Sequence, residues 1–408
     1  MVKGYMELCS CRKIYRNETQ RAVDPAVTLE RIERLLSTTG ITRVADITGL
    51  DRVGIPVFSC IRPAAADGAI SVYNGKGATP IAARVSAIME GIERYSAEVH
   101  DRPLIIGTYG SLAEQGSVVD PQDLILPRDA DPDQVLPWVK GYDIIQHEEV
   151  LLSAHAVFHP LPQGTARLFR TSTNGIASGN TLEEATFHAL AEIVERDAWS
   201  IAEILHDTGP IITDVTDPTA CSLLDAFSKA GVKIVLHDLT SDIRIPTIAA
   251  ASDDPVLRDP GLLTLGMGTH TSAAIATLRA LTEVAQSRVT QIHGAREDTI
   301  EADERRSIGY ERVKRLNRYW YEEKSTVPYS TLASCDTEDF LDDIRVVTDR
   351  LAAVGLDRVI IIDLTRPETG VNVVRVVVPG LETYAMDSER RGERCRHARH
   401  HRLSRTES

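Results

Sequence analysis

Acidic residues recur at helical spacing in the stretch from Asn174 to Asp197, which reads NGIASGNTLEEATFHALAEIVERD. If this stretch is helical, residues three and four positions apart lie on one face. That face then carries three carboxylates and an imidazole, from Glu184, His188, Glu192 and Glu195. Grouped carboxylates repel one another unless cations neutralise them. The pattern therefore indicates either a site that binds cations or the solvated surface of an amphipathic helix.

The same arrangement occurs in two other stretches, NGKGATPIAARVSAIMEGIER around residue 75 and GMGTHTSAAIATLRALTEVAQSR around residue 268. In each copy a glycine turn and a capping Thr or Ser precede an expected helix, and in the central copy Thr181 and Glu184 match a capping box. An E-x-x-[E/Q] motif follows within each helix, at Glu90 and Glu93, Glu192 and Glu195, and Glu283 and Gln286. The residues four positions before these motifs are Ser86, His188 and Arg279. Three independent solvated faces would not share this spacing, so a common site is favoured.

The residue types indicate chemistry on a polyphosphate. Carboxylate oxygens select hard cations such as Mg²⁺ or Mn²⁺ and disfavour zinc. Glycine turns at helix N-termini offer backbone N–H groups to phosphate oxygens. Fixed positive charge would come from Lys76, Arg196, Arg279 and Arg288. The turn NGKGATP is not a Walker A loop, because its lysine lies between two glycines.

A second repeat must position these helices. Three segments contain a β-rich run that ends in Asp-[Ile/Leu]-Thr, then a short loop and a second β-rich run; the aspartates are Asp46, Asp238 and Asp363. An amphipathic helix that stops at a glycine precedes each segment, over residues 28–40, 220–231 and 341–355. We expect the aspartates to cap turns after strands, outside the site. His188 is expected to be packed or hydrogen-bonded rather than catalytic.

The two repeats interleave along the chain, which predicts one intertwined α+β domain over residues 1–390. Residues 101–142 are rich in proline and acids and are expected to form a surface excursion. Residues 391–408 form a basic, polar segment that we expect to be a disordered tail.

Composition limits the class of protein. The 408 residues carry a net charge of −14, which argues against a broad surface for nucleic acid or an anionic membrane. No apolar run is long enough to span a bilayer, and no signal-like segment is found, so we interpret the protein as cytoplasmic. Six scattered cysteines form no C-x-x-C pair, and metal binding by the C-x-C of Cys9 and Cys11 is left open as the weaker alternative to thiols without such a role.

The ordered motifs resemble those of the YcaO family. They are S-x-x-x-E-x-x-E-R from Ser86 to Arg94, N-T-x-x-E-A with E-x-x-E-R from Asn180 to Arg196, and R-x-x-x-E-x-x-Q from Arg279 to Gln286. The resemblance extends from Lys13 to Glu382. It implies that the chain binds ATP and Mg²⁺ and phosphorylates the oxygen of a peptide-backbone amide, which activates the amide towards a nucleophile.

Site residues follow from the resemblance position by position. It implies that Mg²⁺ and the triphosphate are held by Glu90, Glu93, Glu184, Glu192, Glu195 and Glu283. Nucleotide contacts are implied for Lys13, Ser86, Glu90, Asn180, Glu184, Arg196, Arg279 and Gln286. Catalytic roles are implied for Glu192, Glu195, Arg279 and Glu283. No dedicated nucleophilic side chain is then needed, which agrees with the absence of a Ser-His-Asp or Cys-His pattern.

Azoline-forming cyclodehydratases of the family usually end in P-x-P-x-P, whereas this chain ends in HHRLSRTES. That ending is more similar to the branch that works with a TfuA-type partner and a sulfide donor to make a peptide thioamide, for example on a glycine of methyl-coenzyme M reductase. Two alternatives stay open: an azoline-forming cyclodehydratase of ribosomal peptides, and a nucleotide-binding scaffold that presents a peptide or sulfur carrier to another catalyst. The oligomeric state, including a homodimer, is also open.

Overall fold

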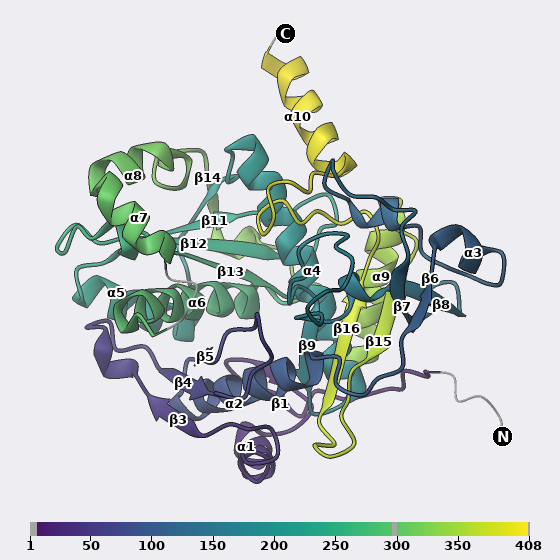
Figure 1. Ribbon diagram of the computed structural model, residues 1–408. Coiled ribbons are helices and arrows are strands. Elements are labelled where there is room, and N and C mark those ends of the chain that lie inside the picture. Colours follow the sequence, from purple (N-terminus) through teal and green to yellow (C-terminus); the bar gives the residue numbers. More distant parts are fainter. Residues whose placement is uncertain (1–5, 296–299, 407–408) are drawn as a thin grey trace.

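The computed structural model describes residues 6–295 and 300–406, and it has the mixed α+β architecture that the sequence predicts (Figure 1). Five strands form one sheet in the order β13 (Leu265–Thr269), β12 (Thr247–Asp253), β11 (Lys233–Asp238), β10 (Ile211–Thr213) and β14 (Thr326–Pro328). A second sheet has the order β6 (Ile105–Gly107), β7 (Leu136–Asp143), β15 (Ile360–Asp363), β16 (Asn372–Val377) and β9 (Ile176–Gly179), and β8 (Glu148–Ser153) also pairs with β7. A third sheet joins β3 (Arg43–Asp46), β4 (Val57–Ile61) and β5 (Val72–Lys76), and a small hairpin joins β1 (Tyr15–Arg16) to β2 (Gln20–Arg21).

The helices lie between and around these sheets. The three helices expected to carry the motifs are α2 (Pro80–Ala97), α4 (Leu182–Leu205) and α6 (Ala273–His293). The others are α1 (Pro25–Glu33), α3 (Tyr109–Ala113), α5 (Pro218–Lys229), α7 (Ile300–Ile308), α8 (Tyr310–Leu316), α9 (Phe340–Ala353) and α10 (Glu393–Thr406). Helix α4 packs on β9 and β16 of one sheet and on β13 of another, so it joins the two halves of the molecule. None of the helices in the described ranges has the length and apolar character needed to cross a lipid bilayer.

The three helix-strand-strand modules are confirmed, but the first helix is shorter than expected, because α1 ends at Glu33 and does not reach Gly40. Helices α1, α5 and α9 precede the antiparallel pairs β3–β4, β11–β12 and β15–β16. In each module the aspartate that ends the first strand accepts a hydrogen bond from a backbone N–H two residues later, at 2.9 Å for Asp46, 3.0 Å for Asp238 and 2.8 Å for Asp363. These aspartates therefore cap turns, as the sequence predicts.

Most glycines of the three motif copies lie in strands, so the expectation that they form turns is wrong for them, whereas Gly175, with a φ of 81°, does lie in a turn. Gly75 lies in β5, Gly179 ends β9, and Gly268 lies in β13. A Cβ atom at any of these positions would collide with the backbone of the helix that follows. The glycines thus allow each helix to fold back against its own strand at close range, which positions the carboxylates that the helix carries.

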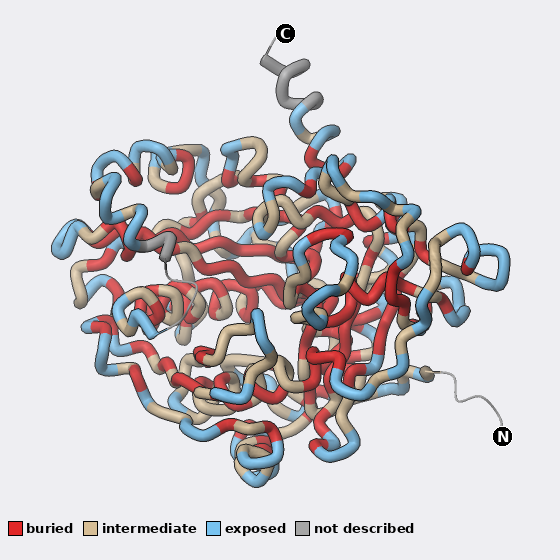
Figure 2. Tube along the Cα trace, in the orientation of Figure 1, coloured by how far each residue is buried: buried red, intermediate tan, exposed pale blue. Residues whose placement is uncertain are grey.

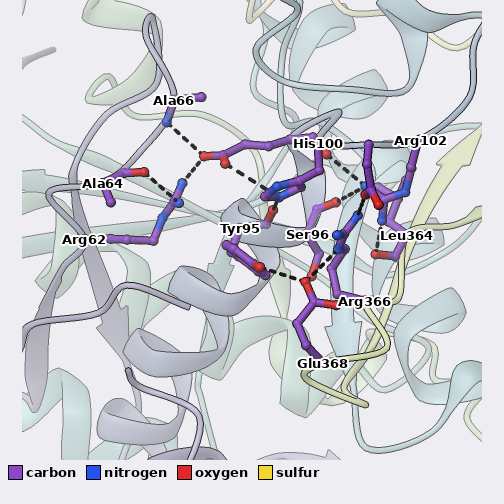
Figure 3. Close-up of polar contacts among 12 residues, drawn as sticks. Arg62, Ala64, Ala66, Tyr95, Ser96, His100, Arg102, Leu364, Arg366 and Glu368 are labelled. Carbon is purple, nitrogen blue, oxygen red and sulfur yellow. Dashed lines mark hydrogen bonds and ion pairs between the residues drawn. The ribbon is translucent and has the colours of Figure 1, made fainter. Parts of the chain in front are cut away.

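Buried residues fill the contacts between the sheets and the helices (Figure 2). Trp138 of β7 and Phe187 of α4 are among the largest side chains that are fully enclosed. The C-terminal end of α2 is tied to the loop after β15, because Arg102 donates to the Leu364 carbonyl at 2.6 Å and the Tyr95 hydroxyl donates to Glu368 at 2.7 Å (Figure 3). This network anchors α2 to the sheet that also supports α4.

Two expectations about the loops differ from the structure. Residues 101–142 are more than a surface excursion, because they contain β6, α3 and most of β7, whose Trp138 is fully buried. The segment 391–408, expected to be disordered, contains α10, and its first turn is packed: Arg394 pairs with buried Asp197 of α4 at 2.9 Å, and Cys395 is buried. The division into a catalytic domain of residues 1–390 and a tail stays a prediction.

Candidate functional site

Helices α2, α4 and α6 bring their motif residues together, and the local sequence explains where each helix starts. The Thr79 hydroxyl oxygen accepts from the Ala82 N–H at the start of α2, and that of Thr181 accepts from the Glu184 N–H at the start of α4. The second half of the expected capping box is not formed in the described part of the chain, because the Glu184 carboxylate accepts from the Ala22 N–H and the Asn180 amide instead.

The first group of site residues joins α2 to α4. Arg94 contacts Glu90 at 3.3 Å and Glu93 at 3.4 Å, and Glu93 also accepts from the Ser178 N–H of β9 at 3.1 Å. Burial raises the pKa of Glu93 to about 8; Arg94 opposes this shift, whereas Glu192 of α4 and Glu90 increase it. The carboxylates of two helices therefore lie close enough to repel one another.

The second group joins α4 to α6 and to β5. Lys76 donates to Glu283, which places the end of β5 beside α6. Burial raises the pKa of Glu195 to about 7, and Glu283 adds to this shift, while Arg196 and Arg279 oppose it. For Glu283 burial opposes ionisation, but Lys76, Arg196 and Arg279 outweigh it and lower the pKa of that carboxyl. All three motif helices thus contribute charged groups to one region.

A third group surrounds the N-terminal hairpin. Asn180 donates to Glu184 at 3.1 Å and accepts from the Thr28 hydroxyl at 2.8 Å. Arg21 of β2 lies 3.8 Å from the Glu184 carboxylate and also contacts the His188 ring. His188 is therefore hydrogen-bonded, in agreement with the sequence-based expectation.

Several predicted residues differ in their surroundings. Lys13 is fully enclosed and donates to Asp343 at 2.5 Å and to Gln20 at 2.6 Å, so its contact with phosphate stays a prediction. Arg288 is not part of the site: its guanidinium is buried against Asp51 at 2.7 Å and Asp254 at 3.0 Å. Ser86 and Gln286 lie on α2 and α6, half-buried.

Three basic residues near the site were not found from the sequence. Arg21 and His270 lie near His188 and Arg279. Both help to lower the pKa of His188, and Arg21 also helps to lower the pKa of His270. Arg279 in turn helps to lower the pKa of Arg21, after burial. Arg375 of β16 is buried and donates to the Ser172 carbonyl at 2.8 Å; burial lowers its pKa to about 9, which nearby Glu192 opposes. Arg375 could have been singled out from the sequence, because it is the one charged residue in the apolar run VVRVVV.

The donor set fits magnesium and phosphate in its chemistry. Across residues 6–295 and 300–406, no three His, Cys, Asp or Glu side chains form a ready metal cluster, because the carboxylates are instead paired with Arg94, Arg196 and Lys76. Several buried atoms of the site have no hydrogen-bond partner among the described residues: Arg94 Nη1, Glu195 Oε2, Arg196 Nε and Arg279 Nε. Buried polar atoms without a hydrogen-bond partner are costly unless a ligand that carries both phosphate and a cation completes the site.

A cavity of about 1080 Å³ lies elsewhere, between the 3₁₀ turn near Ile125, the loop at Arg358 and the start of α10 near Gly392. None of the predicted site residues lines this cavity.

All six cysteines are free. Cys9 and Cys11 lie beside the start of α4, where Cys11 contacts Thr181.

Comparison with known proteins gives three kinds of match. Residues 74–382 match the family model described as YcaO cyclodehydratase, ATP- and Mg²⁺-binding. An uncharacterised protein of Methanothermobacter thermautotrophicus is 49% identical over 383 residues, which cover 92% of this chain and 98% of the relative. A Rhizobium leguminosarum protein, described as lying in the tfuA 3′ region, is 33% identical over 380 residues, covering 89% of this chain and 88% of the relative. The structure of YcaO from Methanopyrus kandleri bound with AMPPCP and Mg²⁺ superposes with a TM-score of 0.79 at 31% identity, and the match covers 94% of this chain and 98% of that one.

Proposed function

The chain belongs to the YcaO family, whose members are ATP-dependent enzymes that act on peptide-backbone amides, and we propose that it phosphorylates an amide oxygen of a peptide or protein in order to install a thioamide. The observation that carries this proposal is the convergence of α2, α4 and α6. Their motif carboxylates and arginines form one charged region that contains unpartnered buried atoms within the described residues.

The proposed roles follow the family motifs, position by position. Mg²⁺ would be held by Glu90, Glu93, Glu184, Glu192, Glu195 and Glu283, and it would neutralise charge on the triphosphate. Nucleotide contacts are assigned to Lys13, Ser86, Asn180, Arg196, Arg279 and Gln286, in addition to Glu90 and Glu184. Glu192, Glu195, Arg279 and Glu283 are assigned to catalysis from the positions that they hold in the family motifs. Their task is to position the γ-phosphoryl group and to stabilise the charge that develops on it.

The reaction balances without a nucleophilic side chain. The amide oxygen takes the γ-phosphoryl group from ATP, and ADP leaves. Hydrosulfide then adds to the activated amide carbon, and inorganic phosphate leaves with the former amide oxygen. Loss of a proton leaves a C=S bond in place of C=O. Hydrogen sulfide is thus consumed as a co-substrate, and a sulfide donor must supply it.

The thioamide branch is favoured by one observation: a relative of similar length is described as lying in the tfuA 3′ region. We therefore infer a TfuA-type partner, with a glycine of methyl-coenzyme M reductase as the first substrate to test. The azoline-forming reaction is the second candidate, and mass spectrometry of the peptide product separates the two. Exchange of oxygen for sulfur raises the mass, whereas ring formation with loss of water lowers it.

Calorimetric titration with ATP, with and without Mg²⁺, tests the nucleotide site. Glu192 is only partly exposed, and its side chain lies 3.9 Å from Arg196, so Glu192→Gln is isosteric and should fold. We expect Mg²⁺-dependent ATP binding by the wild type, weaker binding by Glu192→Gln, and no turnover by that variant. Glu114→Gln, on an exposed residue after α3, is the matched control and should behave as the wild type. Equal turnover by Glu192→Gln and wild type would exclude α4 from the site.

Tight nucleotide binding without any peptide-dependent turnover, even with the partner and peptide present, would instead support the scaffold alternative. In that case the same carboxylates would hold a regulatory nucleotide, and another protein would carry out the chemistry.

A further inference from the structure

Two histidines that the nucleotide assignment leaves out, half-buried His188 and fully buried His270, lie beside the site. His188 is on α4, and His270 lies between β13 and the start of α6. Both pack on Phe187, whose ring centroid lies 5.7 Å from that of His188 and 4.9 Å from that of His270. Neither His188 Nδ1 nor His270 Nε2 has a hydrogen-bond partner within the described residues, and both atoms are buried.

The contacts of the other ring nitrogens determine where each proton lies. The Ser272 backbone N–H donates to His270 Nδ1 at 2.9 Å, so a neutral His270 carries its proton on Nε2. The guanidinium of Arg21 can only donate, and it contacts His188 Nε2, so a neutral His188 carries its proton on Nδ1. In each ring the unpartnered nitrogen is therefore an N–H donor.

Both rings are neutral in this environment. Burial is the main cause that lowers the pKa of His188 well below its usual value, and Arg21 and Arg279 add to this effect. Burial likewise lowers the pKa of His270, with additional contributions from Lys13 and Arg279. The acidic residue that contacts this group is Glu184, whose carboxylate lies 3.8 Å from Arg21. That carboxylate already accepts hydrogen bonds from the Ala22 N–H and the Asn180 amide.

Arg279 supplies a third donor of the same kind. Its Nε is buried and has no partner in the part of the chain that the structure describes. Two guanidinium groups and two imidazole N–H groups thus gather in one place, and each buried donor without an acceptor is destabilising on its own. Such a set is suited to a ligand that offers several acceptor oxygens at once, which a polyphosphate does and an anion with one heavy atom, such as hydrosulfide, does not.

We propose that His188, His270 and Arg279, with Arg21 behind His188, form an oxyanion site that donates hydrogen bonds to phosphate oxygens of the bound nucleotide. This inference rests on the proposed function, because it assumes that the triphosphate lies among α2, α4 and α6. His188 and His270 are then neutral donors that bind the phosphate without taking part in proton transfer. Arg21 acts as a positioning residue that holds the His188 tautomer.

Titration with inorganic tripolyphosphate in the presence of Mg²⁺ tests the site without the adenosine contacts. We expect His188→Leu and His270→Leu each to weaken tripolyphosphate binding about tenfold, as the loss of a hydrogen bond to a charged acceptor implies. His188→Asn keeps a donor at the Nδ1 position and His270→Gln keeps one at the Nε2 position, so both should retain most of the affinity. His293→Leu, near the far end of α6, is the control and should bind as the wild type.

Imidazole ¹⁵N NMR of the wild type provides a second readout that does not depend on the folding of a variant. Tripolyphosphate should shift the Nδ1 resonance of His188 and the Nε2 resonance of His270. If the wild type binds tripolyphosphate but both resonances stay fixed, or if the leucine variants bind it equally well, the histidine assignment is overturned while the nucleotide site stands. If the wild type binds neither ATP nor tripolyphosphate, both the oxyanion site and the proposed function fail.

Discussion

Glu93 should release a proton when Mg²⁺ and ATP bind. Burial raises the pKa of this carboxyl to about 8, so it is mostly protonated at pH 7 in the free protein. A cation binds the ionised form, and binding therefore displaces the proton. Glu93 alone should make the affinity for ATP with Mg²⁺ rise with pH by up to roughly tenfold per pH unit below pH 8 and level off above it. Calorimetry at pH 7 in buffers of different ionisation enthalpy measures the proton directly.

Glu93→Gln is the control for this pH dependence. The amide resembles the protonated carboxyl and cannot release a proton, so the ATP affinity of this variant should rise less steeply with pH. Glu195, whose pKa is raised to about 7, accounts for the pH dependence that remains in the variant below pH 7. Wild-type binding that releases no proton at pH 7 would mean that Glu93 is not a ligand.

Lys13 illustrates how one residue can have two roles that stability measurements separate. Its ammonium and the carboxylate of Asp343 are both fully buried and lie 2.5 Å apart. Lys13→Met leaves Asp343 as an unpaired buried charge and should reduce the free energy of unfolding by about 3 kcal/mol or more. Adding Asp343→Asn should recover part of this loss, and urea denaturation measures both. A Lys13→Met variant of normal stability but weakened ATP affinity would indicate that Lys13 contacts phosphate instead.

At the scale of elements, the glycines in the strands before the motif helices control how closely each helix approaches. A Cβ atom on Gly268 would overlap the Ala276 carbonyl and the Ala280 N–H of α6, which are backbone atoms and cannot move aside alone. We expect Gly268→Ala to reduce the free energy of unfolding by about 4 kcal/mol or more. Because Arg279 and Glu283 lie on the displaced helix, ATP binding should weaken in any protein that still folds. Thermal unfolding and ATP titration measure the two effects.

Gly116→Ala is the matched control, since no atom lies within 4 Å of the Cβ that it adds. Its unfolding temperature should stay close to that of the wild type. If Gly268→Ala were equally stable, the close contact between β13 and α6 would not be what positions the motif.

The elements themselves were largely predictable from the sequence. The spacing of Glu184, Glu192 and Glu195 identified α4, and the Asp-[Ile/Leu]-Thr runs identified the strand pairs of the three modules. The role of the glycines was not predictable, because a glycine in a turn and a glycine under a helix have the same sequence signal. Residues 101–142 were misjudged for a related reason: their prolines suggested loops, while β7 is held by pairing with distant β15.

At the scale of the whole molecule, the repeat of one motif predicted that three distant helices serve one site, and the structure brings their charges together. The sequence could not predict which basic side chains face the site and which are buried in ion pairs elsewhere. Arg279 and Arg288 lie on the same helix, yet the first faces the site and the second is buried against Asp51 and Asp254. Their partners come from other sheets, so only the tertiary arrangement distinguishes them. The same holds for Arg21 and His270, whose roles depend on contacts between the N-terminal hairpin, α4 and α6.

The C-terminal segment joins this arrangement through Arg394, although its composition predicted disorder. Arg394 donates to the Asp197 carboxylate through two nitrogens at 2.9 Å, and Asp197 lies on α4, fully buried. Arg394→Met removes the cation and leaves that carboxylate unpaired on the helix that carries Glu192 and Glu195. We expect a loss of about 3 to 5 kcal/mol in the free energy of unfolding. Arg396→Met, which breaks only an exposed pair with Glu393, should change it by less than about 1 kcal/mol. Equal stability of the two variants in urea denaturation would mean that α4 does not depend on the C-terminal segment. Recovery of the Arg394→Met loss by an added Asp197→Asn would trace that loss to the buried carboxylate.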